Sequence, residues 1–280
     1  MIRLEWYIRH RTEVGKAAFQ RAWGGELGPR LLAFGESLKA ERLVQLSLVE
    51  TSANLGLTEA RGGDMEAFFD GIIELWWPTR AAMEAALSAD DLHATFEKVT
   101  GALTHVASLE DGVIFIAAEH PQVNPSPETL LATPDSGVSK LQFPLRTYQD
   151  RSLADVRAYW LEEHGPLIRK NAVVSSIVRY VQVHRIDSDW NERLAELSQS
   201  KSEPYLGHAE VWVARSGSSA TDEERALASK AAVHDEAKFI DFTRSTLFFV
   251  EETELISREP GVAYNPVSYT HLTLPTIYPV

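Results

Sequence analysis

The strongest constraint on the fold of this chain is that its sequence repeats itself. Adding 137 to any position from 4 to 46 gives a counterpart between 141 and 183, with no gap in either segment. Ten of these 43 pairs are identical, where chance gives about two or three, so we infer an internal repeat. The identical pairs are Leu4/Leu141, Arg9/Arg146, Ala17/Ala154, Trp23/Trp160, Glu26/Glu163, Gly28/Gly165, Pro29/Pro166, Arg42/Arg179, Val44/Val181 and Gln45/Gln182.

The two copies differ where the difference changes chemistry. Trp160-Leu-Glu-Glu-His164-Gly-Pro166 corresponds to Trp23-Gly-Gly-Glu-Leu27-Gly-Pro29, so a histidine stands where the first copy has leucine. Gly207-His-Ala-Glu-Val-Trp212 likewise matches Gly71-Ile-Ile-Glu-Leu-Trp76 at an offset of 136. Histidine exchanges protons near neutral pH, which leucine and isoleucine cannot do. The second half is therefore the candidate site, and the first half its packing partner.

Each half follows the pattern strand, helix, strand, strand, weak helix, strand. Alternating residues predict strands over 4–10, 42–46, 71–76 and 113–118 in the first half, and over 141–147, 179–184, 207–212 and 246–250 in the second. The last strand of each half is expected to end in a carboxylate, Glu119 or Glu252. A helix is expected to begin near Leu153, because Ser152 can cap free amides and Asp155 suits the helix dipole.

The expected architecture is α+β. A βαββαβ half covers one sheet face with helices and leaves the other face to be buried. We therefore expect two such repeats to form an α+β barrel within one chain, with a degenerate repeat over 1–120 and the repeat carrying the candidate site over 140–258. The proline-spaced segment 121–139 is typical of an extended linker.

The C-terminal segment needs separate treatment. Val267-Ser-Tyr-Thr-His-Leu-Thr-Leu-Pro-Thr276 resembles the translation of a sequencing-library adapter. Residues 267–280 are therefore expected to be a non-native tail, with the natural C-terminus missing.

Composition narrows the class of partner. A net charge of −13 is unlike a nucleic-acid-binding surface, which needs clustered lysine and arginine. The chain contains no cysteine, no apolar run of membrane-spanning length and no secretory signal, so a cytoplasmic location is expected. The expected partner is a small hydrophobic or aromatic molecule, with no nucleic acid and no membrane, and a homodimer is compatible with the sequence.

Strand alternation divides the side chains of the second half into two sets. The apolar set is expected to be covered by helices, and it consists of Val181, Val183, Ala209, Val211 and Val213. The other set is expected to face the barrel interior, and it consists of Tyr180, Gln182, His184, His208, Glu210 and Trp212, with Arg146 on the preceding strand.

His164 is the strongest single candidate for catalysis. It lies four residues after Trp160, so both side chains share one helix face. Its imidazole can act as general acid or base, and a buried carboxylate such as Glu210 can fix its tautomer. His184 or His208 is expected to be a second proton-transfer or orienting group. The residues expected to contact substrate are Tyr180, Gln182, Trp212, Trp160 and Arg146.

Structural interpretations stand beside these. Trp, Glu, Gly and Pro persist in both copies of the first motif, which favours packing and turn roles for them. Glu210 matches Glu74, which favours a shared structural hydrogen bond, and Arg146 matches Arg9, which favours a salt-bridged strand residue. The segment 234–241 is expected to be surface and packing rather than a metal site, because no other ligands stand at metal-ligand spacing. Neither a metal nor an organic cofactor is expected.

The second half resembles the EthD family. The resemblance rests on Tyr159-Trp160-Leu-Glu-Glu-His164-Gly-Pro-Leu167, the strand Arg179-Tyr-Val-Gln-Val-His184, the later Gly-x-x-Glu-x-Trp, and Phe239-Ile-Asp241 before a strand ending in Glu251-Glu252. It covers roughly 140–256 well and 4–120 weakly, and it implies a ferredoxin-like unit of the dimeric α+β barrel superfamily. The family's histidines map to His164 and His184, whereas Leu27 and Ser47 depart from the pattern.

The resemblance leaves several reactions open, because fold alone does not fix chemistry. Our leading hypothesis is an acid/base enzyme of the dehydratase or cyclase type, a lyase, acting on an aromatic or polyketide-like substrate. Cofactor-free oxygenation would use the same residues. The alternatives are a non-catalytic barrel that holds a hydrophobic ligand, and a haem-dependent monooxygenase with haem on His164 or His184.

Overall fold

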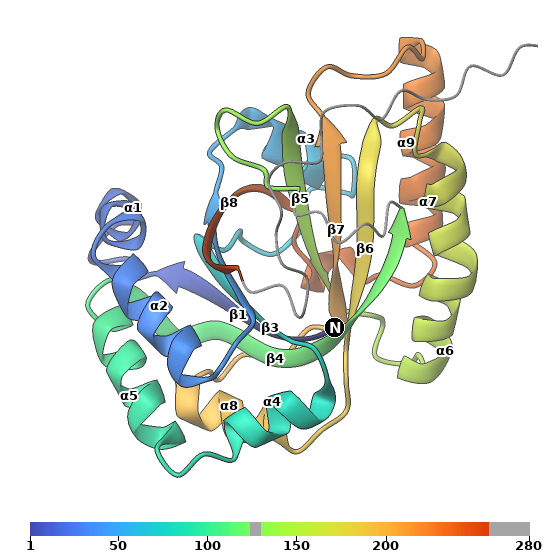
Figure 1. The fold of residues 1–280 in the computed structure, drawn as a ribbon. Helices are drawn as coiled ribbons and strands as arrows, with labels where there is room; N and C mark the ends of the chain where they lie inside the picture. Colours follow the sequence, from blue (N-terminus) through green and yellow to red (C-terminus); the bar gives the residue numbers. More distant parts are fainter. Residues whose placement is uncertain (124–129, 258–280) are drawn as a thin grey trace, which may run out of the picture.

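Eight antiparallel strands close into a barrel with helices on its outside in the computed structural model, which describes residues 1–123 and 130–257 (Figure 1). The strands are β1 (Ile2–His10), β2 (Arg42–Leu48), β3 (Gly71–Trp77), β4 (Ala107–Val123), β5 (Val138–Leu145), β6 (Ile177–Arg185), β7 (Gly207–Ala214) and β8 (Phe248–Ser257). The helices are α1 (Lys16–Gly24), α2 (Leu27–Ser37), α3 (Ser52–Glu59), α4 (Arg80–Leu87), α5 (Leu92–Leu103), α6 (Leu153–Tyr159), α7 (Gly165–Asn171), α8 (Trp190–Ser198) and α9 (Asp222–Glu236), with a π-helical turn η1 (Trp160–His164) and a 3₁₀ turn η2 (Phe242–Arg244).

The strands of each half are neighbours in the barrel. The order around it is β1-β3-β2-β8-β5-β7-β6-β4. The first four strands therefore follow the order β4-β1-β3-β2, and the last four follow the same order, β8-β5-β7-β6. The halves meet at two seams, where β2 pairs with β8 and β4 pairs with β6. Because the ring is closed, neither half presents a free sheet edge.

Helices cover the outer face of both halves, and one helix from each half crosses to the other. α2 and α5 pack on the first half through Phe34 and Phe96, while α6, α7 and α9 lie against the second half (Figure 1). α8 belongs to the second half by sequence, yet Leu194 packs into the first-half core. α3 belongs to the first half, yet Leu57 packs into the second-half core. Each half therefore supplies part of the other's outer wall.

The local predictions hold where sequence alone sets them. α6 begins at Leu153, and the Ser152 hydroxyl accepts a hydrogen bond from the Asp155 amide. The last strands run further than expected, so Glu119 and Glu252 lie inside β4 and β8 rather than at their ends. β4 and β5 also occupy both ends of the expected 121–139 linker. The expected tail, 267–280, lies outside the described residues.

The predicted interior face is wrong for β6. Val181 and Val183 lie in the barrel core, whereas Tyr180, Gln182 and His184 point to the helix side. The pairing with β7 explains this, because Val183 lies opposite His208, and opposite residues share a face. The prediction for β7 is right, since His208, Glu210 and Trp212 do face the interior.

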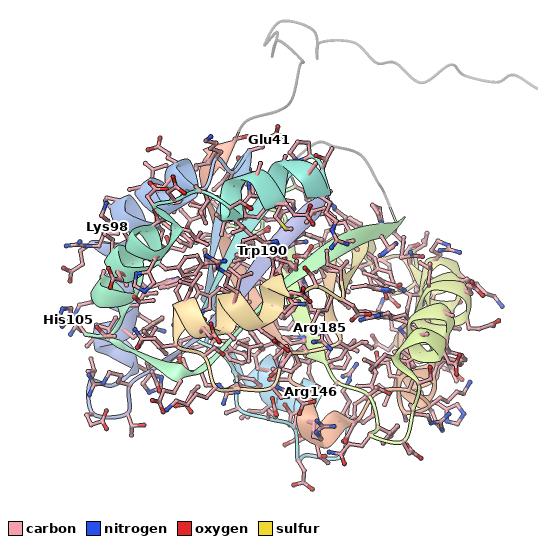
Figure 2. The ribbon with its side chains drawn as sticks, turned by 90° about the horizontal axis from the view of Figure 1, so that it is seen from below. Glu41, Lys98, His105, Arg146, Arg185 and Trp190 are labelled. Atoms are coloured by element: carbon pink, nitrogen blue, oxygen red, sulfur yellow. The ribbon has the colours of Figure 1, made fainter. Side chains whose placement is uncertain are left out.

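Arg146 also lies elsewhere than expected. It follows β5, on the same side of the molecule as Arg185 in Figure 2. Both arginines line a surface hollow. Its guanidinium contacts Glu66 and stacks on the Tyr205 ring, and it donates to two backbone carbonyls. The structure thus gives Arg146 a salt-bridged position, away from the interior.

No helix in residues 1–123 and 130–257 is long and apolar enough to cross a membrane.

Candidate functional site

Charged side chains from both halves meet inside the barrel. Arg3 of β1 makes two hydrogen bonds to Glu210 of β7, at 2.8 and 2.9 Å. Lys140 of β5, the counterpart of Arg3 at offset 137, lies 2.8 Å from Glu210 and 3.0 Å from Glu252. Glu210 is therefore the shared counterion of two buried cations.

The electrostatics of this cluster follow from burial and from the two cations. Burial alone would raise the pKa of Glu210, but Arg3 and Lys140 outweigh it and hold that pKa well below its usual range. Burial raises the pKa of Glu74 to about 8 and also raises that of Glu5. Burial lowers the pKa of His208 to about 4, so its imidazole is neutral at neutral pH.

A second group of polar side chains lies outside the barrel wall, where the sequence bends the helix that carries His164. The chain passes from α6 through the π-helical turn Trp160–His164 into α7, and Pro166 stands at the start of α7. Proline lacks an amide hydrogen, so it cannot continue the preceding hydrogen-bond ladder. At Gly165 any side chain would meet the Gln122 amide oxygen at 2.6 Å. Glycine and proline thus place His164 against the sheet.

His164 is paired with Asp235 of α9, not with Glu210. Its Nδ1 lies 2.8 Å from Asp235 Oδ2, and both side chains are largely buried. Tyr159 and Lys238 also donate to Asp235, at 2.6 and 2.7 Å. Burial alone would raise the pKa of Asp235, but the hydrogen bonds from Lys238, Tyr159 and His164 lower it. An ionised Asp235 keeps the imidazole hydrogen on Nδ1 and leaves Nε2 as the basic atom.

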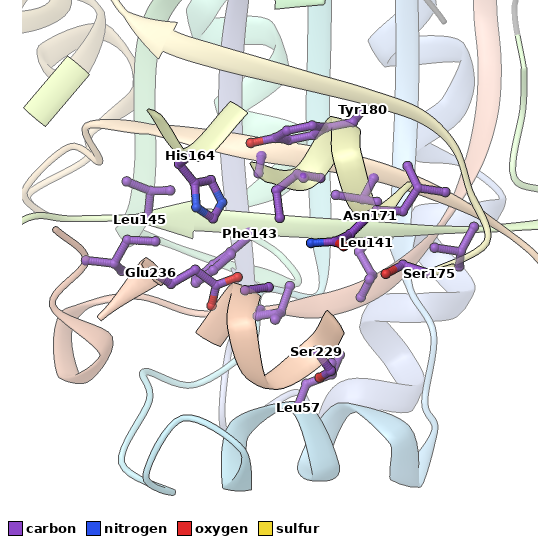
Figure 3. A pocket seen from close by; sticks show the side chains of 18 of the residues that line it. Leu57, Leu141, Phe143, Leu145, His164, Asn171, Ser175, Tyr180, Ser229 and Glu236 are labelled. Atoms are coloured by element: carbon purple, nitrogen blue, oxygen red, sulfur yellow. The ribbon is translucent and has the colours of Figure 1, made fainter. Parts of the chain in front are cut away.

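A mostly apolar cavity of about 220 Å³ adjoins His164 (Figure 3). It lies between the outer face of the second-half sheet and helices α7 and α9. Its walls include Phe143, Leu145 and Val211 from the sheet and Ile168 from α7. Cavities that hold drug-sized molecules are typically larger, at roughly 300–1,000 Å³, so this one suits a compact ligand.

The first half closes one side of the cavity. Leu57 from α3 and Arg61 just after it both line the cavity. Arg61 makes two hydrogen bonds to Glu236 of α9, at 2.8 and 3.0 Å, and its guanidinium lies 5.1 Å from the centre of the Phe143 ring. The polar wall opposite the sheet is therefore a bidentate ion pair that joins the two halves.

Tyr180 places a hydroxyl in the same cavity. Its oxygen accepts hydrogen bonds from Trp160 Nε1 at 3.2 Å and from Gln182 Nε2 at 3.1 Å. Both acceptor sites are thus used, and the hydroxyl hydrogen remains to be donated. Burial raises the pKa of Tyr180, which keeps the hydroxyl protonated. His164 and the hydroxyl end of Tyr180 lie on the same side of the cavity in Figure 3.

The structure divides the sequence-predicted site residues between two places. His164, Trp160 and Tyr180 line the outer cavity. His208, Glu210 and Trp212 lie in the barrel interior, where Trp212 donates to Glu252 at 3.0 Å. One constellation holding all of the predicted residues therefore does not exist.

His184 lies behind the outer cavity. Its ring stacks on Trp160 at 4.3 Å between ring centres, and its Nε2 lies 3.1 Å from the Gln182 amide oxygen. Burial lowers the pKa of His184 to about 3, so this imidazole is neutral. The geometry gives it a packing role beside the π-helical turn.

The sequence analysis did not identify several residues of the outer cavity and of the charged cluster in the barrel interior. Asp235 and Glu236 were expected in a surface segment, and no local pattern pairs them with His164 and Arg61. Arg3 and Lys140 could have been found, because the 137-residue offset extends one position further and pairs two cations. That signal would have predicted charge inside the barrel.

Comparison with known proteins locates one family within the chain. Residues 149–243 match the model of the EthD domain, and this segment includes His164, Tyr180 and Asp235. No curated protein matches the chain.

Two solved structures show low similarity to the whole fold. One is titled a "putative monooxygenase" from Lactobacillus acidophilus NCFM, with 8% identity, a TM-score of 0.41, and coverage of 91% of this chain and 96% of that one. The other is titled an "anthrone oxidase-like protein", with 10% identity, a TM-score of 0.42, and coverage of 81% and 98%.

Proposed function

Residues 149–243 are an EthD domain, and we propose that this domain is an enzyme in which His164 moves protons on a compact aromatic or polyketide-like substrate. The observation that carries the proposal is the His164–Asp235 pair at the wall of an apolar cavity. A basic nitrogen beside an apolar cavity suits proton abstraction from carbon, since excluding water strengthens electrostatic interactions there.

The proposed reaction is dehydration or cyclisation beside a carbonyl. His164 Nε2 accepts a proton from the carbon next to the carbonyl, and the C–H electron pair moves to the carbonyl oxygen. The Tyr180 hydroxyl donates a hydrogen bond to that oxyanion. The electron pair then returns, the bond to a β-hydroxyl breaks, and the His164 imidazolium supplies the proton that completes the departing water. Asp235 stabilises the imidazolium between the two steps.

Haem does not fit this site. The cavity of about 220 Å³ lies below the range for drug-sized ligands, and a four-pyrrole macrocycle exceeds it. The same size suits one or two fused rings. The proposed reaction therefore uses only side chains of the chain itself.

We further propose that the chain is a tandem pair of ferredoxin-like repeats, an intrachain version of the dimeric α+β barrel, whose first half is degenerate. The common strand order of the two halves supports this proposal. Gln45 donates to the Trp23 carbonyl at 2.6 Å, and Gln182 donates to the Trp160 carbonyl at 2.7 Å.

Packed aromatic rings support the degenerate first half. The Trp6 ring lies 6.1 Å from that of Phe34 and 5.9 Å from that of Phe96. Trp6 corresponds at offset 137 to Phe143, which lines the second-half cavity. A bulkier side chain thus stands in the first half where the second half borders open space.

The test is incubation of the purified chain with hydroxylated aromatic and polyketide-like ketones, with and without oxygen, read by mass spectrometry. The proposal expects loss of one water from a substrate, independent of oxygen, and strong loss of turnover in His164→Gln. A product that gains an oxygen atom only when oxygen is present would show that the reaction is oxygenation and not dehydration. Binding without any product would favour the ligand-holding alternative, and full activity of His164→Gln would contradict the proposal.

A further inference from the structure

The barrel interior contains polar atoms that the proposed reaction does not use. Glu5 of β1, Glu74 of β3 and His208 of β7 each place one nitrogen or oxygen so that the three atoms lie within 4.8 Å of one another. All three side chains are fully buried. Strands from both halves of the chain therefore bring an imidazole and two carboxylates to one point.

His208 has no hydrogen-bond partner at this point. Neither of its ring nitrogens makes a hydrogen bond within the described part of the chain. Nε2 lies 3.5 Å from Glu210 Oε1 and 4.0 Å from Glu5 Oε2, with no hydrogen bond to either. Buried polar groups in folded proteins are rarely left without a partner, so the two free nitrogens point to a missing one.

Glu5 is also only partly satisfied. Its Oε1 has an ion pair with Arg3 at 2.7 Å, but neither carboxylate oxygen accepts a hydrogen bond from a described residue. Oε2 is the oxygen that faces His208. The unpartnered atoms of Glu5 and His208 thus face each other from opposite halves of the barrel.

Charge at this point is balanced only while two of the buried carboxylates hold protons, in agreement with the raised pKa of Glu5 and of Glu74, and a bound cation would displace those protons. When ionised, the buried carboxylates outnumber the buried cations Arg3 and Lys140 by two. These carboxylates are Glu5, Glu74, Glu210 and Glu252. The surplus equals the charge of one divalent cation. Glu119, which is partly exposed and contacts Arg3 at 3.3 Å, extends the acidic lining towards solvent.

At this point the two halves of the repeat carry chemically different residues. Glu5 corresponds to Gln142, and His208 corresponds to Ile72, whereas Glu74 and Glu210 correspond to each other. These two differences therefore lie together on one side of the barrel. The other side carries an amide and an alkyl group, which do not bind a metal.

We propose that Glu5, Glu74 and His208 bind one divalent transition-metal ion inside the barrel. Imidazole with carboxylates suits Zn²⁺, Mn²⁺, Fe²⁺ or Co²⁺. Around a tetrahedral ion, metal–ligand bonds of about 2.1 Å place ligand atoms about 3.4 Å apart, so the three atoms, which lie within 4.8 Å of one another, need to approach by up to about 1.4 Å. Arg3 lies 2.7 Å from Glu5 Oε1 and 2.9 Å from Glu74 Oε1, and Lys140 lies 3.4 Å from Glu74 Oε2, so the two cations orient both carboxylates.

The test uses the full chain after chelator treatment, titrated with Co²⁺ and followed by visible absorbance, which reports the coordinating atoms. The expected result is one Co²⁺ per chain and a metal-dependent rise in melting temperature. The variants Glu5→Gln and His208→Ile copy Gln142 and Ile72, residues that the other half already tolerates at equivalent buried positions. Each is expected to weaken Co²⁺ binding at least about tenfold.

His10→Ala is the matched control, because His10 lies beside the carboxylate of Asp70, 2.8 Å away, at a partly exposed position. It is expected to leave the stoichiometry unchanged. Absence of stoichiometric Co²⁺ binding, unchanged binding in both interior variants, or loss of binding in His10→Ala would overturn the proposal. If either interior variant does not fold, imidazole ¹⁵N NMR with and without Zn²⁺ is the deciding measurement. The proposal expects Zn²⁺ to shift the resonances of a buried histidine in the wild type and in His10→Ala alike.

Discussion

His164 Nδ1 lies 2.8 Å from Asp235 Oδ2, although the two residues are 71 positions apart in the chain. The bond joins the π-helical turn to the last turn of α9, so it exists only when both elements are docked on the sheet. It orients the imidazole and fixes which nitrogen is basic. The orientation of this imidazole and the docking of α9 are therefore coupled through one hydrogen bond.

Asp235→Asn is expected to lower turnover of a substrate identified by the incubation test proposed above by roughly 10²–10⁴-fold, the range that general acid–base catalysis contributes. The amide cannot stabilise the imidazolium. Imidazole ¹⁵N NMR should show the Nδ1-protonated tautomer in the wild type and its loss in the variant. Asp187→Asn is the control, because Asp187 pairs with Arg157 at an exposed position. Equal turnover in Asp235→Asn and Asp187→Asn would contradict the assignment.

Tyr180→Phe is expected to reduce kcat about 10²–10³-fold with little change in KM, because it removes a donor that acts mainly on the oxyanion. The free energy of unfolding in urea should also fall by about 1–3 kcal/mol, since Trp160 Nε1 loses its buried acceptor. Tyr148→Phe removes a hydroxyl that donates to Ala237 outside the cavity, and it should leave kcat unchanged. A similar kcat loss in both variants would argue against a role for Tyr180.

His184 predicts the sign of one pH dependence. Its pKa is lowered to about 3 in the folded protein, whereas an unfolded histidine titrates near 6.5. Between these values the unfolded chain binds a proton that the folded one does not, so the stability present above pH 6.5 is lost as pH falls. The slope approaches about 1.4 kcal/mol per pH unit.

The measurement is the free energy of unfolding of the wild type and of His184→Ser, which copies Ser47, between pH 7 and pH 5. The wild type should lose stability more steeply than the variant. Parallel curves would show that the burial of His184 does not disfavour its charged form.

The sequence was sufficient for features set by local patterns. The strand positions follow from alternation, and Leu153 begins a helix because Ser152 caps it. It was not sufficient for the face of β6, because Gln182 and His184 are covered by the Trp160 segment as fully as valines would be. In the sequence, a polar side chain that bonds to a helix backbone cannot be distinguished from one that faces a cavity. Only the pairing of β6 with β7 distinguishes the two.

The candidate site was predicted in part for a related reason. His164 was identified because the repeat places leucine opposite it. Its partner could not be, since a contact between η1 and α9 depends on how two helices dock. Glu210 has the right chemistry for a partner of His164, but its carboxylate is already ion-paired with Arg3 and Lys140.

Arg61 and Glu236 test whether the first half is needed to close the cavity. Both side chains are nearly buried, so Arg61→Met leaves an unpaired buried carboxylate and is expected to cost about 3–5 kcal/mol in urea unfolding. The double variant Arg61→Met, Glu236→Gln should recover most of that loss, because the charge is gone as well. Arg80→Met is the control, since its exposed pair with Glu84 contributes at most about 0.5 kcal/mol.

The same variants separate stability from ligand binding. Arg61 lines the cavity from the first half, so the double variant should remain folded yet bind a substrate of the proposed class more weakly, with a raised KM. Removing the guanidinium opens the wall opposite the sheet and lets water reach the ligand. If the double variant kept the wild-type KM, the first half would stabilise the barrel without shaping the site. If it failed to recover stability, the ion pair would not be what holds α9 against the loop that follows α3.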